Sequence, residues 1–144
     1  DCTDACIDGR TPVLVQATIS GLVNARDCDH CELVDGTYTL EYIGNCRWQY
    51  VDNTIGYCNS GASCYGLTVS FSVYKVGSDY IASLDVARGY CPGTSSQVGC
   101  RWVKVTQSAY DCLNLLLEDG DWSNRYAMNY GCDPASSSAS VNAL

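Results

Sequence analysis

Apolar and polar side chains alternate along much of the chain with a period of two, which predicts strands that bury one face. The clearest case covers residues 65–76, where apolar side chains occupy every second position from Tyr65 to Val73. Similar patterns predict strands over residues 13–20, 36–43, 45–51, 80–86, 100–106, 112–117, 122–130 and 138–144. About nine strands at this spacing are typical of a β-sandwich or barrel.

Turn-forming residues separate these segments and favour antiparallel connections. We expect turns or loops at residues 35–36, 59–63, 76–79, 92–96 and 119–121. The segment that comes nearest to an amphipathic helix, 113–117, is too short to form one. The expected fold is therefore all-β: a disulfide-stapled antiparallel β-sandwich, jelly-roll-like, with about nine strands.

The length of 144 residues predicts a single domain over residues 1–144. Within it, residues 1–11 form a cysteine-containing N-terminal arm, and the Ser-rich residues 135–144 form a C-terminal strand or tail. We expect residues 138–144 to pair as a strand, either in their own sheet or in that of a neighbouring chain.

Charge and cysteine content narrow the functional classes. The net charge is −8, which argues against binding to nucleic acid or to anionic membranes. No apolar run is long enough to predict membrane insertion by a helix. The 11 cysteines indicate an oxidising, extracellular location. Because the chain starts at Asp1 without a Met or an apolar leader, we expect that a signal peptide has been removed.

The spacing of the cysteines does not fix their connectivity, but it favours local pairs. The favoured pairs are Cys58–Cys64, Cys91–Cys100, Cys112–Cys132, and either Cys28 or Cys31 with Cys46. An odd count leaves one thiol, which is either free or bonded to another chain. Cys2 and Cys6 are the candidates for a bond between subunits, because an end of the chain reaches a neighbour most easily.

The motif Cys28-Asp-His-Cys31 allows three interpretations. A redox-active pair needs a βαβ context that this pattern lacks. A zinc site built from Cys2, Cys6, Cys28 and Cys31, with His30 as a further ligand, has plausible spacing but conflicts with an oxidising location. Structural disulfides are the favoured interpretation.

An enzymatic function is not expected. His30 is the only histidine, and it lies between two expected half-cystines, where a general base would have little freedom. No catalytic serine or metalloprotease signature occurs. The three glutamates belong to no recognisable motif, which leaves paired carboxylates without support.

Two binding chemistries stay open. Asp27, Asp29 and Glu32 are weak calcium candidates in a loop that lacks the full pattern of a calcium loop, and no other cofactor is expected. The 11 tyrosines and three tryptophans supply rings that would stack on sugars, although each of Trp48, Trp102 and Trp122 would more often fill a core. O-linked glycans would attach at two hydroxyl clusters, made of Thr94, Ser95 and Ser96 and of Ser136, Ser137, Ser138 and Ser140.

Two stretches carry a resemblance to a known type of module. The first is Cys31-Glu-Leu-Val-Asp-Gly-Thr-Tyr-Thr-Leu40, followed by Cys46-Arg-Trp48; the second joins residues 111–117, 131–135 and 138–141. This arrangement resembles the Cys-rich β modules of secreted and surface proteins in planctomycete-type bacteria. The resemblance implies a secreted, disulfide-stapled β module without assigned catalytic residues.

These observations predict an extracellular structural protein that assembles with copies of itself into a surface fibre or filament. An odd cysteine count, a low content of charged residues, abundant tyrosine and a C-terminal strand favour it. The alternative is a secreted carbohydrate-binding module that uses exposed Tyr and Trp, with or without calcium. The expected partners are thus other copies of the chain or glycans.

Overall fold

Every regular element that the structure describes is a β-strand, which confirms the expected all-β class. The computed structural model describes residues 12–21, 28–29, 35–53, 56–58, 63–64, 66–91, 96–108, 114–118 and 138–144. The strands are β1 (Leu14–Ser20), β2 (Cys28–Asp29), β3 (Gly36–Gly44), β4 (Arg47–Asp52), β5 (Gly56–Cys58), β6 (Ser63–Cys64), β7 (Leu67–Val76), β8 (Asp79–Cys91), β9 (Ser96–Thr106), β10 (Asn114–Glu118) and β11 (Ser138–Ala143).

The main sheet has eight strands in the order β10-β11-β1-β3-β4-β7-β8-β9, and β2, β5 and β6 form a small three-stranded sheet. All described pairings are antiparallel. The described residues do not show the two packed sheets of the expected sandwich: eight strands form one continuous sheet, and the second sheet is small. The strands of the small sheet are two or three residues long, too short for an alternation to predict them.

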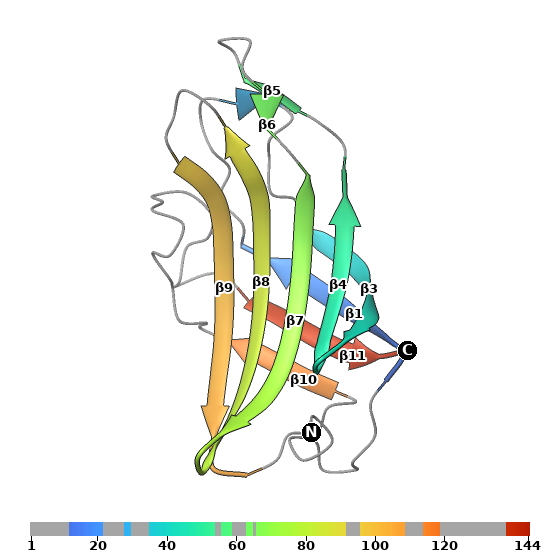
Figure 1. Ribbon diagram of the computed structural model, residues 1–144, viewed down its shortest axis with the longest axis vertical. Helices are drawn as coiled ribbons and strands as arrows, with labels where there is room; N and C mark the ends of the chain where they lie inside the picture. Colours follow the sequence, from blue (N-terminus) through green and yellow to red (C-terminus); the bar gives the residue numbers. More distant parts are fainter. Residues whose placement is uncertain are drawn as a thin grey trace.

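The main sheet curls strongly on itself. In Figure 1, β4, β7, β8 and β9 form a front layer, and β1, β3, β10 and β11 cross behind it. The two edge strands β9 and β10 approach to within 8 Å between Cα atoms, although no strand pairing joins them in the described residues. The result is a nearly barrel-like shape whose concave side holds the core.

The alternation of the sequence sets the two faces of the sheet. A row of large side chains crosses five neighbouring strands on the concave side: Tyr42, Trp48, Phe71, Leu84 and Trp102. The aromatic members pack in tilted pairs, with ring centroids 5.1 Å apart for Tyr42–Trp48 and 5.5 Å apart for Trp48–Phe71. This row joins both layers of the curled sheet, because β3 belongs to the back and β4 to the front.

The C-terminal segment forms a strand in its own sheet. β11 lies between β1 and β10, with Val141 opposite Ala17 on one side and Leu115 on the other. Ala139 and Val141 are buried in the core. The end of the described chain is therefore a central strand rather than an exposed tail.

No helix in the described ranges has the length and apolar character needed to cross a membrane.

Candidate functional site

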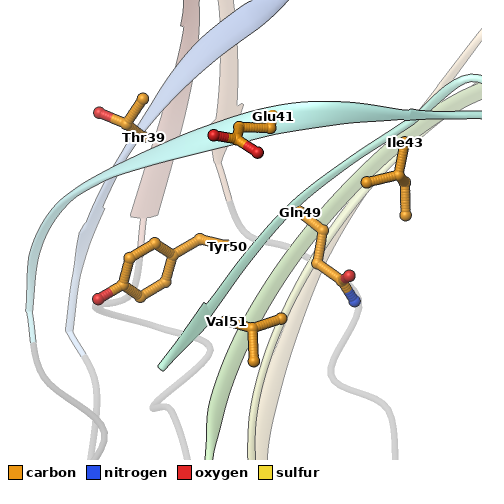
Figure 2. Close-up of a pocket in the computed structure, with 6 residues that line it drawn as sticks. All are labelled: Thr39, Glu41, Ile43, Gln49, Tyr50 and Val51. Atoms are coloured by element: carbon orange, nitrogen blue, oxygen red, sulfur yellow. The ribbon is translucent and has the colours of Figure 1, made fainter. Parts of the chain in front are cut away.

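The main sheet opens between β3 and β4. These strands form a hairpin, but they pair only close to its turn, from Glu41 opposite Gln49 to Gly44 opposite Arg47. Beyond that point β3 continues along β1 and β4 continues along β7. The two strands separate and leave an open hollow of about 430 Å³, lined by Thr39, Glu41, Ile43, Gln49, Tyr50 and Val51. We call this opening the seam; Figure 2 shows its two walls diverging.

Backbone hydrogen bonds fix the direction of the groups along the seam. Tyr42 donates its N–H to the carbonyl of Val13, so even-numbered residues of β3 pair with β1. The odd-numbered residues Thr37 and Thr39 therefore direct their N–H and C=O groups into the seam. Among the described residues, no strand pairs with them on that side.

The hydrogen bonds of β4 fix the direction of the backbone groups on the opposite wall in the same way. Val73 donates its N–H to the carbonyl of Cys46, so even-numbered residues of β4 pair with β7. Val51 then directs its backbone groups toward β3, where no described strand partner lies. Both walls of the seam thus present backbone donors and acceptors that no strand pairing uses among the described residues.

Aromatic packing on the concave side holds the walls apart. Tyr38 of β3 and Tyr50 of β4 are half-buried and pack against each other, with ring centroids 5.4 Å apart. Trp48 is anchored beside them, since its Nε1–H donates to the carbonyl of Pro12 at 2.9 Å. The rings occupy space that narrower side chains would leave for the strands to close.

The side chains of the seam combine apolar and polar chemistry. Ile43 and Val51 are about half exposed, and Glu41 is exposed between them. Glu41 is the one carboxylate among the described lining residues, so the lining offers no pair of carboxylates for acid–base catalysis. The seam is suited to binding an extended chain or a polar ligand with an apolar face.

The bonding states of Cys46 and Cys100 bear on the expected disulfide pairs. Cys46 has a free thiol, so its expected bond to Cys28 or Cys31 is wrong. The reason is geometric: Cys46 lies in the β3–β4 turn, whereas β4 runs about 20 Å from there toward the small sheet that contains Cys28. Cys100 is buried and disulfide-bonded.

The strand register also excludes the expected Cys91–Cys100 bond. Cys91 lies opposite Ser96, and Cys100 lies opposite Val86. The two cysteines are thus several residues apart along the hairpin, farther than the roughly 7 Å between Cα atoms that a disulfide tolerates. Two cysteines on either side of a loop need not form a disulfide, because the pairing of the flanking strands can close the loop by itself.

The small sheet brings together another pair of cysteines. Cys28 of β2 lies directly opposite Cys58 of β5, and Cys64 of β6 lies opposite Gly56. Cα atoms of directly opposed residues in antiparallel strands are about 4.5–5.5 Å apart, which suits a disulfide. The expected Cys58–Cys64 bond stays a prediction, and the register adds Cys28–Cys58 as a second candidate pair.

Several expected site residues lie outside the described residues: Cys2, Cys6, Asp27, His30, Cys31, Glu32, Thr94, Ser95, Cys112, Trp122, Cys132, Ser136 and Ser137. Asp29 and Ser96 are placed by their backbone alone. In the described part of the chain, no three His, Cys, Asp or Glu side chains gather as a metal site would require.

The structure places members of two candidate groups, the serines proposed for O-linked glycans and the tryptophans. Ser138 and Ser140 are half-buried in β11, and the Ser138 hydroxyl makes a 2.9 Å hydrogen bond with that of Ser20. Trp48 and Trp102 are fully buried, so neither supplies the exposed ring that the sugar-binding alternative called for. Tyr50, at the edge of the seam, is the aromatic residue placed to contact a ligand there.

Sequence reasoning did not find the seam. The alternation continues without a break through β3 and β4, because the side chains keep their two faces whether or not the strands pair.

Comparisons with protein-family models, curated proteins and solved structures return no match. The proposed function therefore rests on the fold and the seam.

Proposed function

We propose that this protein is an extracellular structural subunit that assembles with copies of itself into a fibre or filament. The observation that carries the proposal is the seam, where Thr37, Thr39 and Val51 present backbone groups that no strand pairing uses in the described residues. Unpaired strand edges are templates for pairing with another chain. The exposed Ile43 and Val51 add apolar surface that such a contact would bury.

The seam, rather than the C-terminal strand, is the place for pairing between subunits. β11 is hydrogen-bonded on both sides within its own sheet, to β1 and to β10. To exchange this strand with a neighbour, the subunit would have to expose Ala139 and Val141 from its core. The seam offers unpaired groups without that cost.

Disulfides would stabilise the subunit outside the cell. Cys100 is disulfide-bonded, and the register brings Cys28 opposite Cys58. The total of 11 cysteines favours an oxidising location. A disulfide between subunits, formed by Cys2, Cys6 or the free Cys46 under an extracellular oxidant, would lock the assembly covalently.

Sedimentation velocity and negative-stain electron microscopy of the purified chain over a wide concentration range test the proposal. We expect oligomers that grow with concentration into filaments, and a Thr39→Pro variant that stays monomeric because its seam has lost an N–H donor. Thr39→Ala, which keeps the N–H, is the matched control and should assemble.

A monomer at all concentrations, under both oxidising and reducing conditions, would contradict the proposal. Gel electrophoresis without and with reductant tests the proposed disulfide between subunits separately. Covalent oligomers that vanish on reduction identify a disulfide between chains, and Cys2→Ser, Cys6→Ser and Cys46→Ser variants show which thiol forms it.

The alternative is carbohydrate binding in the same hollow. The observation that favours it is the set of side chains that line the seam: the Tyr50 ring with the Glu41 carboxylate, the Gln49 amide and the Thr39 hydroxyl. Affinity electrophoresis against immobilised glycans tests this function. Binding by a monodisperse monomer that Tyr50→Ala abolishes, and that the exposed Tyr74→Ala leaves intact, would establish it in place of assembly.

A further inference from the structure

The main sheet ends in two edge strands of very different length. β10, at one edge, has five residues, and β9, at the other, has 11. Some Cα atoms of the two strands lie within 8 Å of each other, but no strand pairing joins them in the described residues. A long edge strand is a template for another chain, whereas a very short one offers little to pair with. β9 is therefore the edge that needs protection.

The strand register fixes which residues of β9 direct their backbone groups away from the sheet. Even-numbered residues of β7 form their hydrogen bonds with β8, because the odd-numbered Val73 bonds to β4. Carried across β8, where Leu84 lies opposite Trp102, this alternation bonds the even-numbered residues of β9 to β8. The odd-numbered residues, among them Val103 and Val105, thus direct their N–H and C=O groups outward.

The side chains on the convex side of this edge leave it attractive to another strand. Val103 is half-buried, and Val105 is 55% exposed. The charge of Arg101, on the same side, is compensated within the sheet, since its Nε and Nη2 donate to the two carboxylate oxygens of Asp85 at 2.6 and 3.0 Å. None of these side chains sets a charge against an incoming strand on the core side.

Lys104 lies between the two valines, on the opposite, concave side of β9. It is opposite Ala82 and two residues from Trp102, both of which are buried in the core. Lys104 itself is exposed. The edge strand thus carries a charged side chain on the face that otherwise holds the core.

A strand that paired with β9 would bring its own side chains against Lys104. Even-numbered residues of β9 would form the non-hydrogen-bonded pairs of the new ladder, in which the side chains are closest. Two copies of β9 that paired antiparallel about this position would set two ammonium groups opposite each other, which is destabilising. Natural sheets use inward-pointing charges on edge strands to prevent such pairing.

The seam has no equivalent charge. Thr39 and Val51 are uncharged, and so are Tyr38 and Tyr50 on the concave side beside them. Glu41 lies on the convex side, at the end where β3 and β4 still pair. The core side of the seam is therefore open to a pairing strand, whereas that of β9 is not.

We propose that Lys104 keeps the β9 edge from pairing with other chains. Where subunits join at the seam, this residue confines their contact to that surface, and this part of the inference rests on the proposed function. The protection of β9 itself holds whether or not the seam assembles.

Removal of the charge tests the inference in a chain whose seam is blocked by Thr39→Pro. Adding Lys104→Thr should lower the concentration at which sedimentation velocity detects oligomers by about tenfold or more, because Thr suits a strand and carries no charge. Adding Val105→Pro as a third change should restore the monomer, since it removes an outward N–H. Val105→Ala, which keeps the N–H, should leave the oligomers intact.

Lys75→Thr is the matched control. It removes the same charge from the concave side of β7, which lies between β4 and β8 rather than at an edge, and it should not promote association. Lys104→Arg keeps the charge and should also leave the chain unassociated. Circular dichroism and thermal unfolding check that each variant is folded, and Lys104→Gln replaces Lys104→Thr if that variant is not.

Three results would overturn the role of Lys104: no added association in Lys104→Thr, equal association in Lys75→Thr, or oligomers that persist with Val105→Pro. The seam is tested separately, by comparing the wild-type chain with Thr39→Pro alone. A wild-type chain that stays monomeric while the single variant Lys104→Thr associates would overturn self-assembly and support the protection of β9.

Discussion

The two hairpins β3–β4 and β7–β8 have the same topology but opposite degrees of closure. Both turn through two residues, and both contribute strands to one continuous sheet. β7–β8 is paired along its whole length, from Leu67 opposite Arg88 to Val76 opposite Asp79. β3–β4 pairs only near its turn, across a bulge at Ile43.

The difference in closure depends on the side chains packed between the two strands of each hairpin. It also depends on the neighbouring strands with which each of them pairs. The concave side of β7–β8 carries Val69, Val73 and Ala82 beside the larger Phe71 and Leu84, and the strands stay paired across all of them. The concave side of β3–β4 carries Tyr38 and Tyr50, whose rings fill the opening. β1 and β7 also draw the two strands into different layers. Closure of a hairpin is therefore decided by the packing around it.

Proline substitution should separate the two hairpins most strongly. Ser72 of β7 directs its N–H toward β8, so Ser72→Pro breaks a ladder bond in the paired hairpin and should cost about 3 kcal/mol or more. Thr39→Pro removes an N–H that points into the seam and should cost less than about 1 kcal/mol. Chemical denaturation of dilute monomer measures both, with Ser72→Ala and Thr39→Ala as controls. Equal costs would mean that the Thr39 N–H is paired within the subunit.

The two buried tryptophans should respond differently to removal of the indole N–H. The Nε1–H of Trp48 donates to Pro12, whereas that of Trp102 is buried without a partner in the described structure. Trp48→Phe loses volume and a hydrogen bond, and should cost about 2–3 kcal/mol. Trp102→Phe loses similar volume but relieves an unpaired donor, so its cost should be about 1 kcal/mol or more below that of Trp48→Phe. Thermal and urea unfolding compare them, and a larger cost at Trp102 would show that its N–H is bonded.

A matched valine pair compares the core with the seam. Val69 is fully buried on β7, while Val51 is about half exposed at the seam. Val69→Ala should cost about 1.5–2 kcal/mol, and Val51→Ala less than about 0.5 kcal/mol in the monomer. A large cost at Val51 in dilute monomer would indicate that the seam closes in solution.

The smallest effect concerns the turn of the open hairpin. Asn45 and Cys46 have φ values of 52° and 61°, as a type I′ turn requires, and Cys46 occupies the position that most often holds glycine. Cys46→Gly should stabilise the chain by about 0.5–1 kcal/mol, because it relieves a left-handed conformation. Cys46→Ser, which keeps the strain, should change stability little. A loss of stability in Cys46→Gly would show that packing of the half-buried thiol outweighs the strain.

The sequence alone predicted the strands and their faces well. The period of two placed Val69, Phe71 and Val73 on one side of β7, and all three are buried. It also predicted the strand at the C-terminus, although not that it would lie between β1 and β10. The cysteine pairs were predicted less well, because loop spacing says nothing about which strands lie opposite each other. Cys100 and Cys46 show this most clearly.

The sequence by itself determined the all-β class, the direction of the core side chains and the turn between β7 and β8, since these depend on local alternation and turn chemistry. Only the tertiary structure decided that β3 and β4 separate and that Cys46 keeps a free thiol. Such features depend on contacts between residues distant in the chain. An alternating strand has the same sequence pattern whether its edge is paired or open.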